Sequence, residues 1–129
     1  MPKPAPKNPD DAHLHDMLEA ARLIRVYMRK VGFKEFWHHN EKRDAVALRL
    51  SVIGEAAAHV SPATQKTLPS TPFKQIRGLR NRIAHDYGAI DFKIVWEVTQ
   101  KEIEPLIAAL EVYMGKVPRT AAPTEGRKK

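Results

Sequence analysis

Cysteine is absent from this 129-residue sequence. Its absence excludes disulfide scaffolds, zinc or iron–sulfur sites with cysteine ligands, and thiol nucleophiles. Also missing is any apolar run near the roughly 18–20 residues that span a bilayer, and residues 1–9, rich in proline and lysine, lack the apolar core of a signal peptide. We therefore expect a soluble, cytoplasmic protein with one domain, since single cores typically form from about 100–150 residues.

Sustained alternation of apolar and polar residues, which is typical of strands, is missing as well. Helical spacing takes its place. Apolar residues recur every three or four positions from Asp10 to Val31, with acidic residues at the start for an N-terminal cap and Gly32 as a stop. The following residues, Phe33 to Asn40, are predicted to form a short aromatic connection.

A second helix is predicted from Glu41 to about Val60. Its apolar residues cover more than one stripe, so it should be buried on two sides, either at the centre of a bundle or at a subunit interface. The proline-containing stretch from Ser61 to Pro72 is predicted to be a long connection with one helical turn at residues 62–67.

Two more helices complete the predicted fold. The third begins with Pro72 at its first helical position and runs to Tyr87. Asp91 caps the fourth, which extends to about Met114 and should be kinked by Pro105. We predict an all-α, up-and-down bundle of four or five helices.

Positive charge exceeds negative charge by seven, but the excess lies at the ends of the chain. Residues 1–9 carry +2 and residues 116–129 carry +4, which leaves +1 for residues 10–115. We therefore divide the chain into a disordered N-terminal tail (1–9), a helical domain (10–115) and a basic disordered C-terminal tail (116–129). The nearly neutral domain disfavours a small DNA-binding protein, although the basic tail could add affinity for RNA.

The densest polar cluster lies at the end of the third predicted helix. On a helix with about 100° per residue, Arg80 and Tyr87 share one stripe, and Asn81 and His85 form an i, i+4 pair on the next ridge. A cluster of this kind can also be a solvated helix end that complements the dipole. Its members are Arg77, Arg80, Asn81, Arg82, His85, Asp86 and Tyr87.

These side chains suit cleavage of an RNA phosphodiester without a metal or cofactor. A histidine, with a pKa of about 6.5, can exchange the proton of the 2′-hydroxyl or of the leaving 5′-oxygen, and a guanidinium can hold the phosphate bidentately. One histidine cannot easily be both acid and base in an in-line displacement. A two-fold homodimer that pairs two copies of the third helix would supply a second His85 and Arg80.

The segment Arg80-Asn81-Arg82-Ile83-Ala84-His85-Asp86-Tyr87 resembles the Arg-x4-His-x-Tyr motif of the HepT-like toxins, a branch of the HEPN ribonuclease superfamily. Ile53-Gly54-Glu55-Ala56 is similar to that family's Ile-Gly-Glu-Ala segment, and Asp91 with Ile94-Val95-Trp96 resembles the stretch after the motif. The likeness covers roughly residues 10–112. It implies a HEPN-like bundle and a toxin of a toxin–antitoxin system that acts as a homodimeric endoribonuclease.

The resemblance also implies roles for single residues. Arg80 and His85 would be the catalytic pair, and Asn81 would orient the site. Tyr87 would receive AMP from a cognate MNT-type nucleotidyltransferase antitoxin that uses ATP, which would place a bulky anion near Arg80 and repel RNA. Beside them, Arg77 and Arg82 are candidates for RNA binding.

Glu55 falls in the mostly apolar second helix, where a carboxylate needs a partner. An arginine of the third helix would make Glu55 a supporting residue of the site, and an exposed position at the helix edge is the alternative. A different class of function also stays open. The chain could be a non-catalytic helical module that docks a nucleotidyltransferase, with Arg80 and His85 contacting phosphate without transferring protons.

Overall fold

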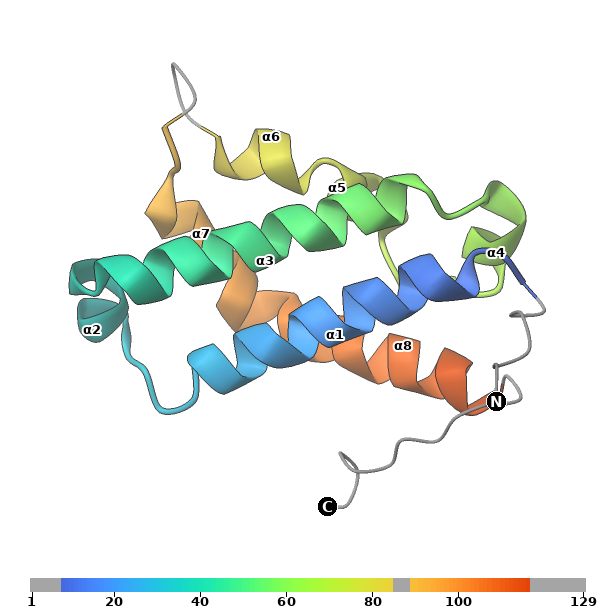
Figure 1. The fold of residues 1–129 in the computed structure, drawn as a ribbon, viewed down its shortest axis with the longest axis horizontal. Coiled ribbons are helices and arrows are strands. Elements are labelled where there is room, and N and C mark those ends of the chain that lie inside the picture. The colour runs from blue at the N-terminus through green and yellow to red at the C-terminus, as the bar shows by residue number, and fades with distance from the viewer. Residues whose placement is uncertain (1–7, 85–88, 117–129) are drawn as a thin grey trace, which may run out of the picture.

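The computed structural model describes residues 8–84 and 89–116. Across these two ranges the chain forms eight helices and no strand, apart from one isolated antiparallel bridge between Ala84 and Ile90. The prediction of an all-α bundle is confirmed. The helices are, in chain order, α1 (Asp11–Tyr27), α2 (Phe33–His38), α3 (Asn40–Ala58), α4 (Pro62–Lys66), α5 (Phe73–Arg77), α6 (Leu79–Ile83), α7 (Phe92–Lys101) and α8 (Ile103–Lys116) (Figure 1).

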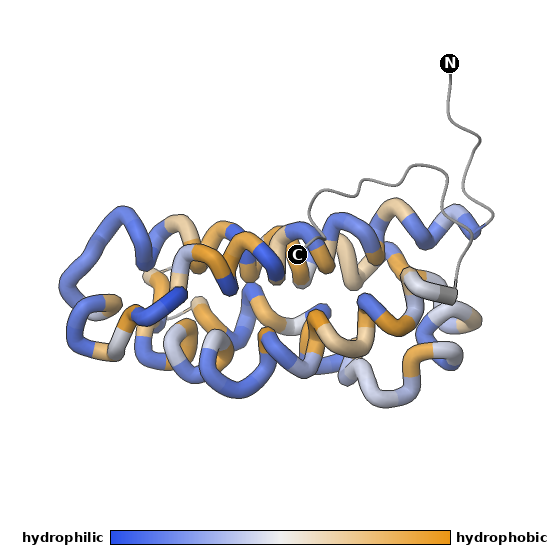
Figure 2. Tube along the Cα trace, turned by 90° about the horizontal axis from the view of Figure 1, so that it is seen from below, coloured by the Kyte–Doolittle hydropathy of each residue, from blue (hydrophilic) through white to orange (hydrophobic). Residues whose placement is uncertain are grey.

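The long helix α3 lies at the centre of the bundle. It runs beside α1 and also packs against α2, α5, α6 and α7 (Figure 1). Ala47 and Ala56 of α3, nine residues apart and therefore on opposite sides of the helix, are both buried, so the prediction that this helix is buried on two sides is confirmed. Figure 2 shows hydrophobic positions concentrated between the helices and hydrophilic positions on the outer turns.

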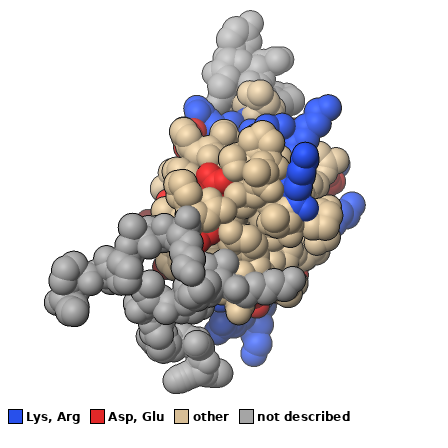
Figure 3. All heavy atoms as spheres, turned by 90° about the vertical axis from the view of Figure 1, so that its right-hand side faces the viewer, with Lys and Arg blue, Asp and Glu red and all other residues tan. Residues whose placement is uncertain are grey.

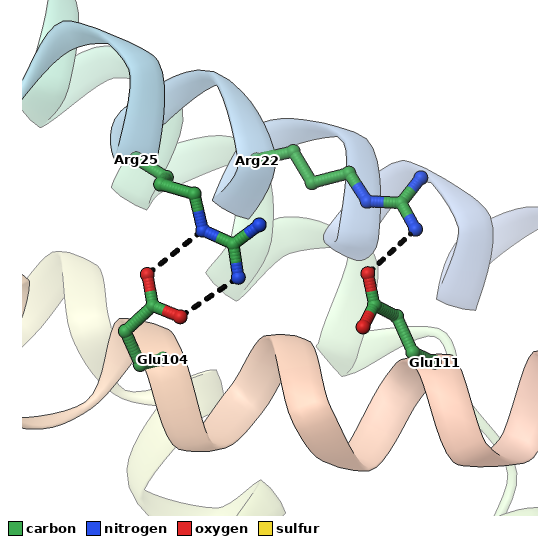
Figure 4. A network of polar contacts seen from close by, with 4 residues as sticks. All are labelled: Arg22, Arg25, Glu104 and Glu111. Carbon is green, nitrogen blue, oxygen red and sulfur yellow. Dashed lines mark hydrogen bonds and ion pairs between the residues drawn. The ribbon is translucent and has the colours of Figure 1, made fainter. Parts of the chain in front are cut away.

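Two ion pairs connect α1 to α8 (Figure 4). Arg25 donates hydrogen bonds of 2.8 and 2.7 Å to the two carboxylate oxygens of Glu104, and Nη2 of Arg22 lies 2.8 Å from Oε2 of Glu111. The bonds from Arg25 lower the pKa of the Glu104 carboxyl. Because all four side chains are partly exposed to water, each pair contributes at most about 1 kcal/mol.

The start of α1 is held by a contact far away in the sequence. Asp10 occupies the N-cap position, but its side chain makes no capping hydrogen bond. Its buried carboxylate accepts bonds from the Ser61 backbone N–H (3.0 Å) and from the Ser61 hydroxyl (2.6 Å) instead. Ser61 in turn caps α4 by accepting from the Thr64 N–H, so the predicted helical turn at residues 62–67 is confirmed and is tied to the start of α1.

The aromatic connection predicted at residues 33–40 is wrong, because most of it forms α2. The Phe36 N–H bonds to the Gly32 carbonyl at 3.0 Å, and the Phe36 side chain is completely buried. Six residues are too few for a helix that is stable by itself. Burial of Phe36 in the tertiary structure therefore decides this element, which the local sequence pattern does not reveal.

The single helix predicted from Pro72 to Tyr87 is also wrong, because the chain forms two short helices that end earlier. Helix α5 ends at Arg77, Gly78 joins it to α6, and Pro72 precedes α5 as its N-cap. Helix α6 ends at Ile83, because the Ile83 carbonyl accepts a 2.6 Å hydrogen bond from the Asp91 N–H. In a longer helix that carbonyl would accept from the residue four positions on.

The interruption predicted at Pro105 is confirmed and is placed at Glu102, between α7 and α8. A proline clashes with the carbonyl of the residue four positions earlier and has no N–H to donate to it. Helix α7 accordingly ends at Lys101. The Asp91 carboxylate caps α7 as predicted, accepting from the backbone N–H groups of Lys93 and Ile94.

The predicted tails lie largely outside the described residues. Asn8, within the first of them, donates a 2.8 Å hydrogen bond to the Thr64 hydroxyl, and Lys116 ends α8. None of the helices in the described ranges is long and apolar enough to cross a membrane.

Candidate active site

An open pocket of about 480 Å³ lies between α3 and the segment formed by α5 and α6. One wall belongs to α3 and the opposite wall to the two short helices. The pocket extends to the place where the chain leaves α6 at Ala84 and returns at Ile90. The described residues that line it are Ser51, Gly54, Glu55, Ala58, Arg77, Arg80, Asn81, Ile83, Ala84 and Ile90.

Gly54 sets the distance between the two walls. It is buried in α3, and a Cβ atom added to it would lie 3.2 Å from the carbonyl oxygen of Ile76 in α5 and 3.5 Å from Cβ of Leu79. A glycine therefore allows the backbone of α5 to approach α3 closely. Ser51, Glu55 and Ala58 share one face of α3 by helical spacing and line the pocket beside this contact.

Two guanidinium groups line the opposite wall. Arg77 ends α5, Arg80 lies within α6, and both residues are exposed. Neither forms a hydrogen bond or ion pair with another described residue. In the end-on view of Figure 3, one group of Lys and Arg side chains gathers at the level of α5 and α6. Two such guanidiniums on one pocket favour an anionic ligand, and phosphate can accept bonds from each bidentately.

Glu55 is the carboxylate of this pocket among the described lining residues. Its side chain is 65% exposed, and its Oε2 lies 3.9 Å from Nε2 of His59, one turn further along α3, so the two form an ion pair only when the imidazole is protonated. The predicted partner, an arginine of the third helix, is not found in the described part of the chain. The alternative, an exposed position at the helix edge, is what the structure shows. Glu55 nevertheless shares the pocket with Arg80 and Asn81.

Arg82 has a different environment from Arg77 and Arg80. Its guanidinium donates bonds of 3.0 and 2.7 Å to the two carboxylate oxygens of Glu102, and this pair raises the pKa of Arg82. The pair joins α6 to the junction between α7 and α8. Sequence reasoning missed Glu102, because no local pattern connects two residues 20 positions apart. Of the two arginines proposed to bind RNA, the pocket therefore includes Arg77 and not Arg82.

His85 and Tyr87 lie outside the described residues. A shared helical stripe for Arg80 and Tyr87 requires a helix through residue 87, whereas Ala84 is already extended, with ψ of 144°. The prediction of a shared stripe therefore loses its helical basis. Ala84, the residue before His85 in the sequence, lines the same pocket as Arg80 and Asn81. Within the described ranges, no group of three or more His, Asp or Glu side chains is arranged to hold a metal ion.

Comparison with known proteins decides the family. Residues 17–113 match the family model described as "Ribonuclease HepT-like". This chain belongs to the HepT-like ribonuclease family. The match spans the pocket and every described helix except the start of α1 and the end of α8.

Several curated proteins are similar to this HepT-like chain over most of their own length. "Putative RNase MJ1380" from Methanocaldococcus jannaschii is 29% identical over 101 residues, which are 78% of this chain and 93% of that protein. "Putative RNase MJ1216" from the same organism is 33% identical over 98 residues, covering 76% and 81%. "Probable ribonuclease HepT" from Thermococcus cleftensis is 26% identical over 99 residues, covering 77% and 90%. No solved structure matches this chain.

Proposed function

We propose that this HepT-like protein is the toxin of a toxin–antitoxin pair and cleaves RNA as a metal-independent endoribonuclease. The observation that carries the proposal is the pocket in which Arg80, Asn81 and Arg77 lie together without described partners, with Ala84 leading directly to His85. The family membership and the names of the relatives support RNA as the substrate.

In the proposed reaction, Arg80 binds the scissile phosphate and stabilises the charge that develops on its oxygens. One His85 accepts the proton of the 2′-hydroxyl as the 2′-oxygen attacks phosphorus. A second His85 gives a proton to the 5′-oxygen as its bond to phosphorus breaks. The products are a 2′,3′-cyclic phosphate and a 5′-hydroxyl, so that no metal-bound water is required.

The second His85 is proposed to come from a second copy of the chain. The surface beside the pocket supports this proposal. Leu48 is 58% exposed and lies one turn before Ser51 on the same face of α3, and Ile90 at the pocket is 37% exposed. Exposed apolar side chains next to a polar pocket offer a second copy of the chain a surface to cover. We expect Leu48→Glu to abolish the dimer in sedimentation equilibrium and RNA cleavage with it, whereas Val112→Glu on α8 should change neither.

Control of the enzyme is proposed to occur at Tyr87, through AMP transferred by an MNT-type nucleotidyltransferase antitoxin that uses ATP. The added phosphodiester would carry negative charge close to the Arg80 pocket and would compete with RNA phosphate. Incubation with the partner enzyme and ATP should add the mass of one or more AMP groups to the peptide that contains Tyr87. An unchanged mass of that peptide would refute this mode of control.

The test of the activity is cleavage of a mixed RNA substrate in EDTA. Wild type, Arg80→Ala and His85→Ala are compared after intact mass has shown each to be unmodified at Tyr87, and Arg29→Ala serves as a control that also removes one exposed positive charge. We expect cleavage by wild type and by Arg29→Ala only. If folded wild type leaves RNA intact, the protein is instead a module that docks the nucleotidyltransferase without cleaving RNA.

A further inference from the structure

A second surface feature lies at the end of the molecule that carries α2 and the start of α7 (Figure 1). Aromatic rings from α2 and α7 meet there. Phe33 lies 5.5 Å from Trp37 and 5.4 Å from Trp96 between ring centroids, the latter edge-on. Phe36 lies beneath them, 5.6 Å from Trp96 and 6.5 Å from Phe92. We refer to Phe33, Trp37, Phe92 and Trp96 as the aromatic platform.

The platform is only partly buried. Phe36 is completely buried, whereas Phe33 and Trp37 are 42% and 41% exposed. Burial of a large aromatic ring is among the most favourable contributions to folding. Burial of Phe36 stabilises the core in this way, whereas Phe33 and Trp37 keep part of their apolar surface in contact with water. Large exposed rings that lie side by side are typical of surfaces that contact a ligand or a partner.

A positive charge is built into this surface. The guanidinium of Arg43 in α3 lies over the Phe92 ring at 4.2 Å and 5.9 Å from the centre of the Trp37 ring. One of its nitrogens donates to the Asn40 side chain, and its buried Nε has no described partner. Lys93, next to Phe92, is exposed. A cation within an aromatic surface can attract phosphate while the rings stack on bases.

The platform is continuous with the candidate active site along the chain. Ile90 lines the Arg80 pocket, and Phe92, two residues further on, begins α7 and lies under Arg43. Helix α7 packs against both α6 and α2. Phe92 therefore connects the Arg80 pocket to the aromatic platform along the backbone.

We propose that the aromatic platform binds unpaired bases of single-stranded RNA beside the Arg80 pocket, with Trp37 and Phe33 as the stacking rings and Arg43 as the cation. This inference rests on the proposed function, because RNA must be the ligand of that pocket. Stacking on aromatic faces is the usual way in which proteins hold single-stranded RNA, and paired bases do not offer their faces. The platform should accordingly select single strands over duplexes.

Trp37 and Trp96 are the two tryptophans of the chain, and both belong to the platform. Intrinsic fluorescence therefore reports on the site directly. The probe is a 12-nucleotide single-stranded RNA with 2′-O-methyl groups, which cannot be cleaved through its 2′-oxygens. In a Trp96→Phe variant, whose emission comes from Trp37 alone, we expect binding of this RNA to quench the emission, and the same RNA in a duplex to quench it far less.

Affinity is then measured by anisotropy of the labelled RNA with matched variants. Trp37→Leu keeps an apolar side chain without a ring, and Trp37→Phe keeps a ring. We expect Trp37→Leu to weaken binding about fivefold or more, as the loss of one stacked base does. Trp37→Phe should retain most of the affinity. The control Val112→Ala, which changes a 60% exposed residue of α8, should bind RNA as wild type does. Circular dichroism confirms that each variant is folded.

The outcomes separate this inference from the proposed function. In one outcome, RNA binds and is cleaved while Trp37 emission is unchanged and Trp37→Leu binds as wild type does. That result refutes RNA binding at the aromatic platform and leaves the proposed ribonuclease activity supported. If Trp37→Leu instead dissociates a dimer in sedimentation equilibrium, the rings form a contact between copies and the inference fails. If wild type neither binds this RNA nor cleaves the unmodified RNA, both proposals fail together.

Discussion

Arg82 and Glu102 form a bidentate ion pair with hydrogen bonds of 3.0 and 2.7 Å. This pair joins α6 to the junction between α7 and α8. Each side chain is about one-third exposed. Glu102 lies at the junction that Pro105 imposes between α7 and α8. Arg80 lies two residues before Arg82 in the same short helix, so this contact helps to hold the candidate catalytic arginine in place.

Arg82→Ala should lower the free energy of unfolding by about 1–2 kcal/mol, since it leaves a carboxylate that is only about one-third exposed without its partner. Urea denaturation measures this loss. Arg22→Ala, which removes one bond from the more exposed pair with Glu111, is expected to cost less than half as much. Equal effects of the two substitutions would show that the pair with Glu102 has no special role.

Gly54→Ala should destabilise the protein by about 1–3 kcal/mol, because the new Cβ must displace the backbone of α5 at Ile76. The gain in helix propensity, about 1 kcal/mol, offsets only part of this cost. RNA cleavage should also fall, since α5 carries Arg77 and leads into α6.

Gly115→Ala in α8 is the matched control for Gly54→Ala, because a Cβ at that position meets no atom within 4 Å. We expect it to raise the thermal midpoint slightly and to leave cleavage unchanged. A stabilised Gly54→Ala protein would mean that α5 shifts away from α3 without cost.

Asp10 should make stability depend on pH in acid. Hydrogen bonding from the Ser61 hydroxyl, and then from Thr64, lowers the pKa of the Asp10 carboxyl. A carboxyl with a lowered folded pKa stabilises the fold fully above its unfolded pKa, and this contribution disappears as pH falls through the folded pKa. We expect Asp10→Asn to cost about 1 kcal/mol at pH 7 and progressively less below about pH 4.

Urea denaturation of wild type and Asp10→Asn between neutral and acid pH tests this expectation. Asp16→Asn, on an exposed residue of α1, should match wild type throughout. A difference between wild type and Asp10→Asn that stays constant with pH would show that the carboxylate charge does not matter.

Arg77 and Glu55 should change RNA affinity in opposite directions, since they place opposite charges on one pocket. Arg77→Ala is expected to weaken binding and to reduce the slope of log affinity against log salt by about one. Glu55→Gln removes a repelling carboxylate and should strengthen binding. Titration of a labelled, uncleavable RNA at several salt concentrations measures both, and unchanged affinity in both variants would place the RNA elsewhere.

The features that could be predicted from the sequence are those with local causes. The periodic apolar residues of α1 and α3 predict amphipathic and central helices, and the structure has both. Asp91 caps α7, and Pro105 ends a helix at Lys101, because a carboxylate and a proline ring act on the backbone within a few residues.

The features that sequence reasoning missed depend on residues far apart in the chain. Helix α2 forms because the Phe36 side chain is buried in the core. Helix α6 ends at Ile83 because the Ile83 carbonyl accepts a hydrogen bond from the Asp91 N–H. The partner of Arg82 is Glu102, and Glu55 lies 3.9 Å from His59 instead of beside the expected arginine.

The amino-acid sequence by itself determined that the chain is all-α, and it marked Arg80, Asn81 and Arg77 as the residues to look for. Only the tertiary structure decided which of the neighbouring charges share a pocket. The physical reason is that hydrophobic period, caps and prolines act over one or two helical turns. The packing of α3, α6 and the α7–α8 junction decides that Arg82 forms an ion pair while Arg80 lines the pocket.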